Sequence, residues 1–133
     1  LTLVFVTHDL RVVNFFCDRL AVMYMGRLVE LGTRKQIMEE SRHPYTRMLL
    51  DAAPRDEPGV EIDRPWVKNE LDATAPLGNA CNFAARCWAR QALGNPERCM
   101  TERPEDHLRE DGRVVACHFE EQIPALAAAE TAR

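Results

Sequence analysis

The first ten residues of this 133-residue chain read LTLVFVTHDL and decide which fold class the sequence predicts. Residues 1–6 place leucine, valine and phenylalanine on both sides of a pleat, which predicts a strand buried on both faces inside a parallel sheet covered by helices. His8 would then lie at the carboxyl end of that strand, the edge where open α/β sheets bind their ligands. Because helix amino termini also point outward at this edge, His8 is a candidate for contacting a phosphate.

The triplet Thr7-His8-Asp9 also has a purely structural interpretation. Thr7 or Asp9 can accept hydrogen bonds from backbone N–H groups at the start of a helix, while His8 faces solvent. A single histidine after a strand is a weak signal of a site, so spacing alone leaves both interpretations open.

The segment that follows alternates between helical and strand-like patterns. The predicted elements are a helix at residues 10–17, strands at 20–25 and 28–31, and helices at 33–40 and 44–53. Gly26 allows the tight turn of a hairpin, and Thr33 with Gln36 forms a capping box at a helix start. Pro44 suits the first turn of the last helix, and His43 before it is interpreted as structural.

These motifs resemble the end of the ATPase subunit of ABC transporters, in particular the oligopeptide/dipeptide importers. The matching pieces are LVFVTHDL at residues 3–10, DRLAVMYMGRLVELGT at residues 18–33 and RHPYTRMLL at residues 42–50. In that family the histidine of the T-H-D triplet is the switch histidine, which contacts the γ-phosphate of ATP. The resemblance therefore implies that His8 is both the catalytic and the ATP-binding residue of this chain.

The fold class that follows is α/β: the C-terminal part of an ABC-type nucleotide-binding domain followed by a small, loop-rich four-cysteine extension. The predicted divisions are the ATPase part at residues 1–53, a linker at 54–80, the cysteine-containing extension at 81–119, and a tail at 120–133 that forms at most a short, fraying helix. Trp66 is expected to dock the proline-rich linker onto a folded surface. Because the chain has no initiator methionine and opens inside a buried strand, we expect it to be a piece of a longer protein.

Composition excludes several classes of protein. A net charge of −4 and a pI of 5.6 argue against nucleic acid as a partner, since phosphate binding needs a clustered basic face. No stretch approaches the roughly 18–20 apolar residues that span a bilayer, and nothing resembles a signal peptide. We therefore expect a cytoplasmic protein, in which five cysteines indicate metal binding or free thiols before disulfides.

Four of the cysteines lie between residues 81 and 117. Cys81, Cys87, Cys99 and Cys117 are separated by five, eleven and seventeen residues. Four thiols in a segment with few other means of building a core predict a metal site, and thiolate suits both zinc and an iron–sulfur cluster. The spacing contains no C-x-x-C pair and does not identify the metal.

The resemblance extends to this region. Peptide-importer ATPases often end in C-x-F-x-x-R-C, a third cysteine and V-A-C, which correspond here to residues 81–87, Cys99 and residues 115–117. In members of this group the extension can hold a [4Fe–4S] cluster. The resemblance implies Cys81, Cys87, Cys99 and Cys117 as its ligands, with Zn²⁺, or metal-free thiols or disulfides, as the alternatives.

The sequence lacks the phosphate-binding loop, the Mg²⁺-binding carboxylate and the water-orienting glutamate of such ATPases, so we expect this chain alone not to hydrolyse ATP. The resemblance implies an intact subunit that uses ATP and Mg²⁺ and pairs with a second ATPase subunit. That subunit would be peripheral to the inner or plasma membrane through transmembrane permease subunits, and would work indirectly with a substrate-binding protein. A hypothesis of another class is an Fe–S or zinc protein-interaction module without a catalytic role. The irregular cysteine spacing does not favour a small redox protein.

Overall fold

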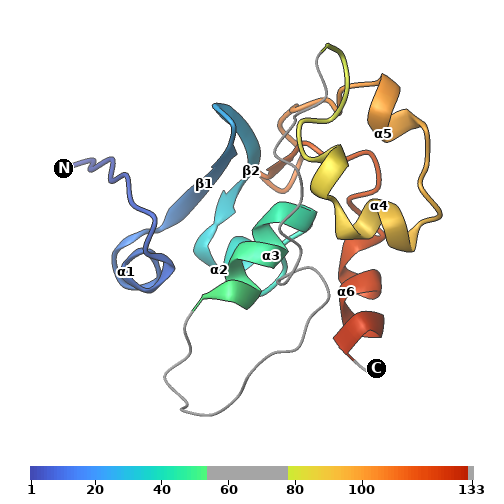
Figure 1. Ribbon diagram of the computed structural model, residues 1–133. Coiled ribbons are helices and arrows are strands. Elements are labelled where there is room, and N and C mark those ends of the chain that lie inside the picture. The colour runs from blue at the N-terminus through green and yellow to red at the C-terminus, as the bar shows by residue number, and fades with distance from the viewer. Residues whose placement is uncertain (54–77, 132–133) are drawn as a thin grey trace.

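The computed structural model describes residues 1–53 and 78–131 as a small mixed helix and sheet structure (Figure 1). Most of the predicted linker, with Trp66, lies outside the described residues. In chain order the elements are α1 Leu10–Phe16, β1 Arg19–Tyr24, β2 Arg27–Thr33, α2 Arg34–Met38, α3 Pro44–Ala52, a 3₁₀ turn Ala84–Arg86, α4 Trp88–Ala92, α5 Arg98–Thr101, β3 Val114–Val115 and α6 Ile123–Thr131. Within these residues, no helix combines the length and apolar character needed to cross a bilayer.

The sheet has three antiparallel strands in the order β1-β2-β3. The predicted hairpin is confirmed: Met25 and Gly26 both have positive φ, at 48° and 75°, and connect β1 to β2. The third strand comes from the cysteine region, since Val114 pairs with Leu31 and Val115 with Glu30. The C-terminal segment therefore extends the sheet that the hairpin begins.

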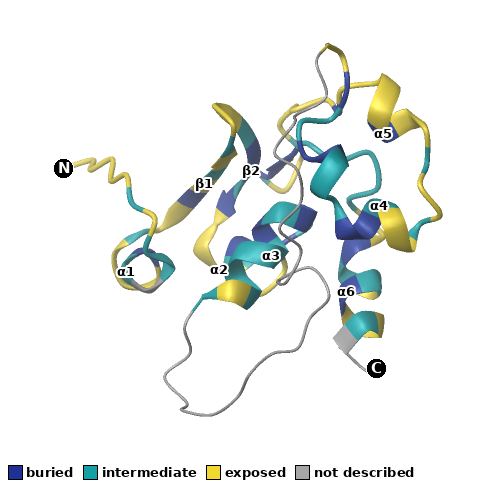
Figure 2. Cartoon of the chain, viewed as in Figure 1, coloured by how far each residue is buried: buried dark blue, intermediate teal, exposed yellow. Residues whose placement is uncertain are grey.

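The predicted strand at residues 1–6 is wrong for this structure. These residues form no strand, and Leu3, Val4 and Val6 are 78, 86 and 91% exposed. Figure 2 shows the start of the chain as exposed, in line with the exposed class of residues 1–6. A two-sided apolar strand is buried only where neighbouring strands and covering helices are present, and the described residues supply neither for this segment.

The local helix signals are mostly confirmed. Thr33 Oγ1 accepts from the backbone N–H of Gln36 at 3.3 Å while Gln36 Oε1 accepts from that of Thr33 at 2.8 Å, which is the predicted capping box. His43 is the N-cap of α3, with its Nδ1 accepting from the Tyr45 N–H at 3.1 Å, and Pro44 occupies the first turn. The helix expected to reach residue 40 ends earlier, at Met38.

The cysteine region packs onto the hairpin and α3. Trp88 Nε1 donates to the Pro44 carbonyl at 3.0 Å, and the guanidinium of Arg113, only 2% exposed, donates to the Glu40 carbonyl at 2.8 Å. The expectation of a fraying tail is wrong, because Ile123 and Ala127 of α6 are buried against Trp88. The predicted boundaries 53/54 and 80/81 stay a prediction. The segment before residue 54 and the cysteine region nevertheless share buried contacts.

Candidate functional site

The Thr7-His8-Asp9 triplet forms a local turn ahead of α1. Thr7 Oγ1 accepts from the Asp9 N–H at 3.0 Å, and the Asp9 carbonyl accepts from the Val13 N–H at 3.4 Å. His8 is exposed. This is the geometry of the capping interpretation, and it also leaves the imidazole of His8 accessible to a ligand from outside these residues.

His8 and the cysteines occupy different parts of the structure. The helix α1 that follows His8 lies on the β1 side, whereas α4, α5 and α6 lie beyond β2 (Figure 1). Cys17, at the end of α1, packs with Val13 and Leu20 away from the other cysteines. The structure therefore does not bring His8 and the predicted metal ligands together.

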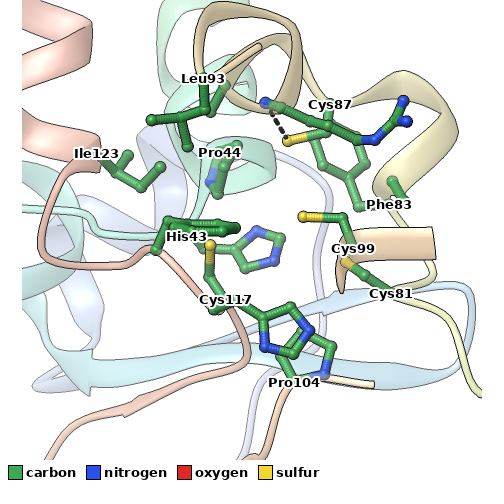
Figure 3. Close-up of a pocket in the computed structure, with 15 residues that line it drawn as sticks. His43, Pro44, Cys81, Phe83, Cys87, Leu93, Cys99, Pro104, Cys117 and Ile123 are labelled. Carbon is green, nitrogen blue, oxygen red and sulfur yellow. Dashed lines mark hydrogen bonds between the residues drawn. The ribbon is translucent and has the colours of Figure 1, made fainter. Parts of the chain in front are cut away.

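The four predicted metal ligands do come together. Cys81, Cys87, Cys99 and Cys117 all line one cavity of about 20 Å³, and Figure 3 shows their sulfur atoms around the same space. They come from four separate places: the loop before the 3₁₀ turn, the N-cap of α4, α5, and the residue two beyond β3. All four thiols are free. Sequence spacing of five, eleven and seventeen residues is thus converted by the fold into a single cluster.

Backbone hydrogen bonds hold the segments that carry the four cysteines. The Cys81 N–H donates to the Cys99 carbonyl at 3.0 Å, and Cys87 Sγ accepts from the Arg90 N–H at 3.4 Å. Cys117 follows Ala116, whose N–H donates to the Val29 carbonyl of β2 at 2.8 Å. The cluster is therefore anchored to the sheet at one corner and to α4 at another.

His43 also lines this cavity, although the sequence did not connect it with the cysteines. It is 2% exposed, and besides accepting from Tyr45 its ring donates to the carbonyl of Ala116, next to Cys117. Burial lowers the pKa of His43 to about 3, so the imidazole is neutral near pH 7. Thirty-seven residues separate His43 from Cys81, and no local pattern marks the contact.

The cavity favours neutral thiols when no cation is bound. Burial raises the pKa of Cys87 to about 12 and raises the pKa of Cys81, Cys99 and Cys117 as well. At Cys99 the neighbouring Arg90 guanidinium opposes this rise in pKa. A bound metal cation would have to displace the thiol protons, so binding would strengthen as the pH rises.

The donor chemistry fits a thiolate-ligated group, although the thiols do not already form a coordination shell. Among the described residues, no three ligand side chains stand close enough to hold a single ion as they are. The cavity is close to the size that one water needs. Arg90 Nε is buried in the described structure without a hydrogen-bond acceptor, which an anionic tetrathiolate group beside it could supply. Side-chain rotation of the cysteines would be needed to enclose a metal group.

A second cavity of about 240 Å³ adjoins the first. Cys81, His43 and Phe83 line both, and Arg27, Arg103 and Asp106 line only the larger one. Cys81 is the one cysteine among the described residues that borders both spaces. The larger cavity therefore reaches the thiol cluster at Cys81.

The comparisons with known proteins all point to ATP-binding subunits of transport systems. The family model described as oligopeptide/dipeptide transporter, C-terminal region, matches residues 29–93. The chain is 38% identical over 117 residues to the dipeptide transport ATP-binding protein DppF of Haemophilus influenzae, covering 88% of this chain and 34% of that protein. It is 40% identical over 123 residues to DppF of Escherichia coli, covering 92% of this chain and 35% of that protein. It is 34% identical over 119 residues to the oligopeptide transport ATP-binding protein OppF of Haemophilus influenzae, covering 88% of this chain and 34% of that protein.

These matches define the chain as part of an ABC transporter ATP-binding protein. It belongs to the oligopeptide/dipeptide transporter family and corresponds to the C-terminal part of the ATP-binding subunit. The chain spans about a third of the length of the curated relatives it matches. The family match also runs across the predicted boundaries at residues 53 and 80.

Proposed function

We propose that this chain is the C-terminal part of the ATP-hydrolysing subunit of a peptide importer and that it contributes the switch histidine, His8. The observation that carries the proposal is the similarity to dipeptide and oligopeptide ATP-binding proteins over most of this chain. The intact subunit would bind ATP and Mg²⁺ through residues outside this chain. It would pair with a second ATPase subunit on transmembrane permease subunits at the cytoplasmic face of the membrane, and a substrate-binding protein would deliver the peptide.

The geometry around His8 is compatible with that role. The Thr7–Asp9 hydrogen bond closes a turn with His8 at its centre, and the imidazole is exposed. In the intact subunit the ring would donate a hydrogen bond to a γ-phosphate oxygen and hold the phosphate for in-line attack by water. Asp9 precedes α1 and serves the turn and the helix start, with its carbonyl accepting from Val13.

Replacing His8 by alanine in the intact subunit is expected to lower kcat for ATP hydrolysis about 10²–10³-fold, the usual loss when one donor to a transition-state oxygen is removed. ATP affinity should change little, because the phosphate loop and Mg²⁺ supply most ground-state contacts. Steady-state hydrolysis and nucleotide-binding titrations of purified H8A test this. The matched control is His107→Ala, another exposed histidine. A decrease in kcat of less than about tenfold for H8A would exclude the assigned role.

The cluster of thiols supports a second function in the same chain. We propose that Cys81, Cys87, Cys99 and Cys117 hold a [4Fe–4S] cluster, or alternatively Zn²⁺, in a protein-interaction module without a catalytic role. The convergence of four thiols from four segments on one cavity carries this proposal. Such a group, when bound, cross-links the segments that its ligands come from. The residues of this chain contribute the thiolates, the backbone donor of Arg90 to Cys87, and the apolar wall around them.

Anaerobic purification and reconstitution distinguish an iron–sulfur cluster from zinc. With iron and sulfide supplied, we expect four irons and four sulfides per chain and the brown colour of a cluster, and a higher melting temperature than for the metal-free chain. A colourless protein holding one Zn²⁺ per chain identifies the structural-zinc alternative. Single Cys→Ser changes at the four positions should abolish stoichiometric loading, whereas Cys17→Ser should not. Equal metal content in Cys117→Ser and Cys17→Ser would contradict the four-ligand site.

A further inference from the structure

Cys81 and Cys99 differ from the other two clustered thiols because their backbones are in direct contact. The Cys81 N–H donates to the Cys99 carbonyl at 3.0 Å. With standard bond lengths, this single bond keeps the two Cα atoms within about 7 Å, the outer limit across which a disulfide can form. The spacing of the two backbones is therefore compatible with a disulfide.

The remaining two thiols are held by other parts of the fold. Cys87 Sγ caps α4 by accepting from the Arg90 N–H, and Cys117 is tied to the sheet through the bond from Ala116 to Val29. Among the described backbone hydrogen bonds, neither Cys87 nor Cys117 is joined directly to another of the four cysteines. A disulfide that involves Cys87 would have to break the helix cap, and no described backbone hydrogen bond holds Cys117 beside another of the four cysteines.

Access also favours the first pair. Cys81 borders the 240 Å³ cavity, whereas Cys87, Cys99 and Cys117 line only the smaller one. A small oxidant such as hydrogen peroxide that enters the larger cavity therefore meets Cys81 there. Cys99 is buried, and its backbone is the one that the Cys81 N–H contacts.

We propose that Cys81 and Cys99 form a reversible disulfide when the metal-free chain meets a peroxide. Cys81 loses its proton, and the thiolate attacks one peroxide oxygen and breaks the O–O bond, which gives a sulfenic acid on Cys81; the hydroxide that leaves takes up the proton and is released as water. Cys99 sulfur then attacks the sulfenic sulfur, forming the S–S bond and releasing a second water. In total the two thiols lose two protons and two electrons, and one peroxide takes them up and is reduced to two waters.

The disulfide and a metal group compete for the same thiols. Forming the bond removes two of the four thiols, so the oxidised chain cannot supply four cysteine ligands, and a bound metal would protect Cys81 from peroxide. Only this consequence rests on the proposed metal site. The pairing itself depends on the position of two backbones and holds whether or not a metal binds.

Mapping of the thiols tests the pairing directly on the unaltered chain. The metal-free, reduced, full 133-residue chain is treated with one equivalent of hydrogen peroxide, alkylated, digested and analysed by mass spectrometry. We expect one principal cross-linked peptide, Cys81 to Cys99, which disappears on reduction, with Cys17, Cys87 and Cys117 alkylated. Another principal pair, or five thiols that are all alkylated or overoxidised, overturns the proposal.

Two variants sharpen the result. Cys99→Ser should leave Cys81 as a sulfenic acid that dimedone traps, and the matched variant Cys87→Ser should retain the Cys81–Cys99 peptide. Iron loading is measured separately on untreated protein. A chain that loads iron but forms a different disulfide disproves the pairing alone, whereas a chain that forms the expected disulfide but never binds metal disproves the metal site alone.

Discussion

Acidification from pH 6.5 to pH 3 is expected to destabilise this chain, with His43 alone contributing about 4 kcal/mol, because His43 is buried as a neutral imidazole. Burial lowers the pKa of His43 to about 3 in the folded chain, from 6.5 in the unfolded chain. Between these values the unfolded chain binds a proton that the folded chain does not. The stability is therefore fully present above about pH 6.5 and is lost as the pH falls toward 3.

The contacts of His43 explain why protonation is unfavourable. Its Nδ1 accepts from the Tyr45 N–H at the start of α3, and a protonated ring has no acceptor nitrogen to offer. A charged imidazole would also lie in the apolar wall beside Phe83, with ring centroids 5.9 Å apart. Protonation of His43 would therefore remove the helix cap and bury a charge at the same time.

Glu30 opposes this effect at lower pH. Its carboxylate is fully buried and accepts from the Arg42 N–H at 2.7 Å and the His43 N–H at 3.3 Å. Burial raises the pKa of Glu30 above 4.5, so stability falls as the pH rises from 4.5 to that raised value. Protonation of Glu30 thus offsets part of the loss of stability that His43 causes in acid.

Urea unfolding of the reduced, metal-free chain at a series of pH values, followed by circular dichroism, measures the effect. His43→Asn keeps a good N-cap acceptor for Tyr45 but does not titrate, so we expect a lower stability at pH 7 and a flatter dependence on pH. His107→Asn changes an exposed histidine and should leave the profile as it is. Equal slopes for the unaltered chain and His43→Asn would show that another group controls acid unfolding.

Replacing Phe83 by alanine is expected to lower the free energy of unfolding by about 3–5 kcal/mol. Phe83 is 1% exposed, and its ring contacts Tyr24 and Tyr45 with centroids 5.2 and 5.4 Å apart. These partners belong to β1 and α3, whereas Phe83 belongs to the loop between Cys81 and Cys87. The ring therefore holds the cysteine loop against the hairpin, and its removal leaves a void where three segments meet.

Denaturant titrations of Phe83→Ala, Phe83→Leu and Phe16→Ala provide the comparison. Phe83→Leu retains most of the volume and should cost less than Phe83→Ala. Phe16 is 80% exposed, so the same change there should alter stability by no more than about 0.5 kcal/mol. Because Phe83 lines both cavities, we also expect faster alkylation of Cys81 in native Phe83→Ala. Similar stability losses for Phe83→Ala and Phe16→Ala would contradict the packing role.

Local sequence signals predicted local structure well. Gly26 at the hairpin, the Thr33–Gln36 capping box and Pro44 in the first turn of α3 each act through backbone geometry within a few residues. The predictions for residues 1–6 and the tail were wrong because both concerned burial, which depends on what a segment packs against. Apolar residues 1–6 meet no covering layer among the described residues, whereas α6 packs against Trp88.

By itself the sequence determined the family of this protein, its helix caps and turns, and the kinds of side chain available for chemistry: one histidine in a T-H-D triplet and four cysteines near the end. Only the tertiary structure decided that the four thiols share one cavity, that His43 and Phe83 form its wall, and that the Cys81 and Cys99 backbones touch. The physical reason is the separation along the chain of the residues that interact. A cap or a turn is made by neighbours in the chain, but a cavity is made by segments that meet because their apolar faces leave water together.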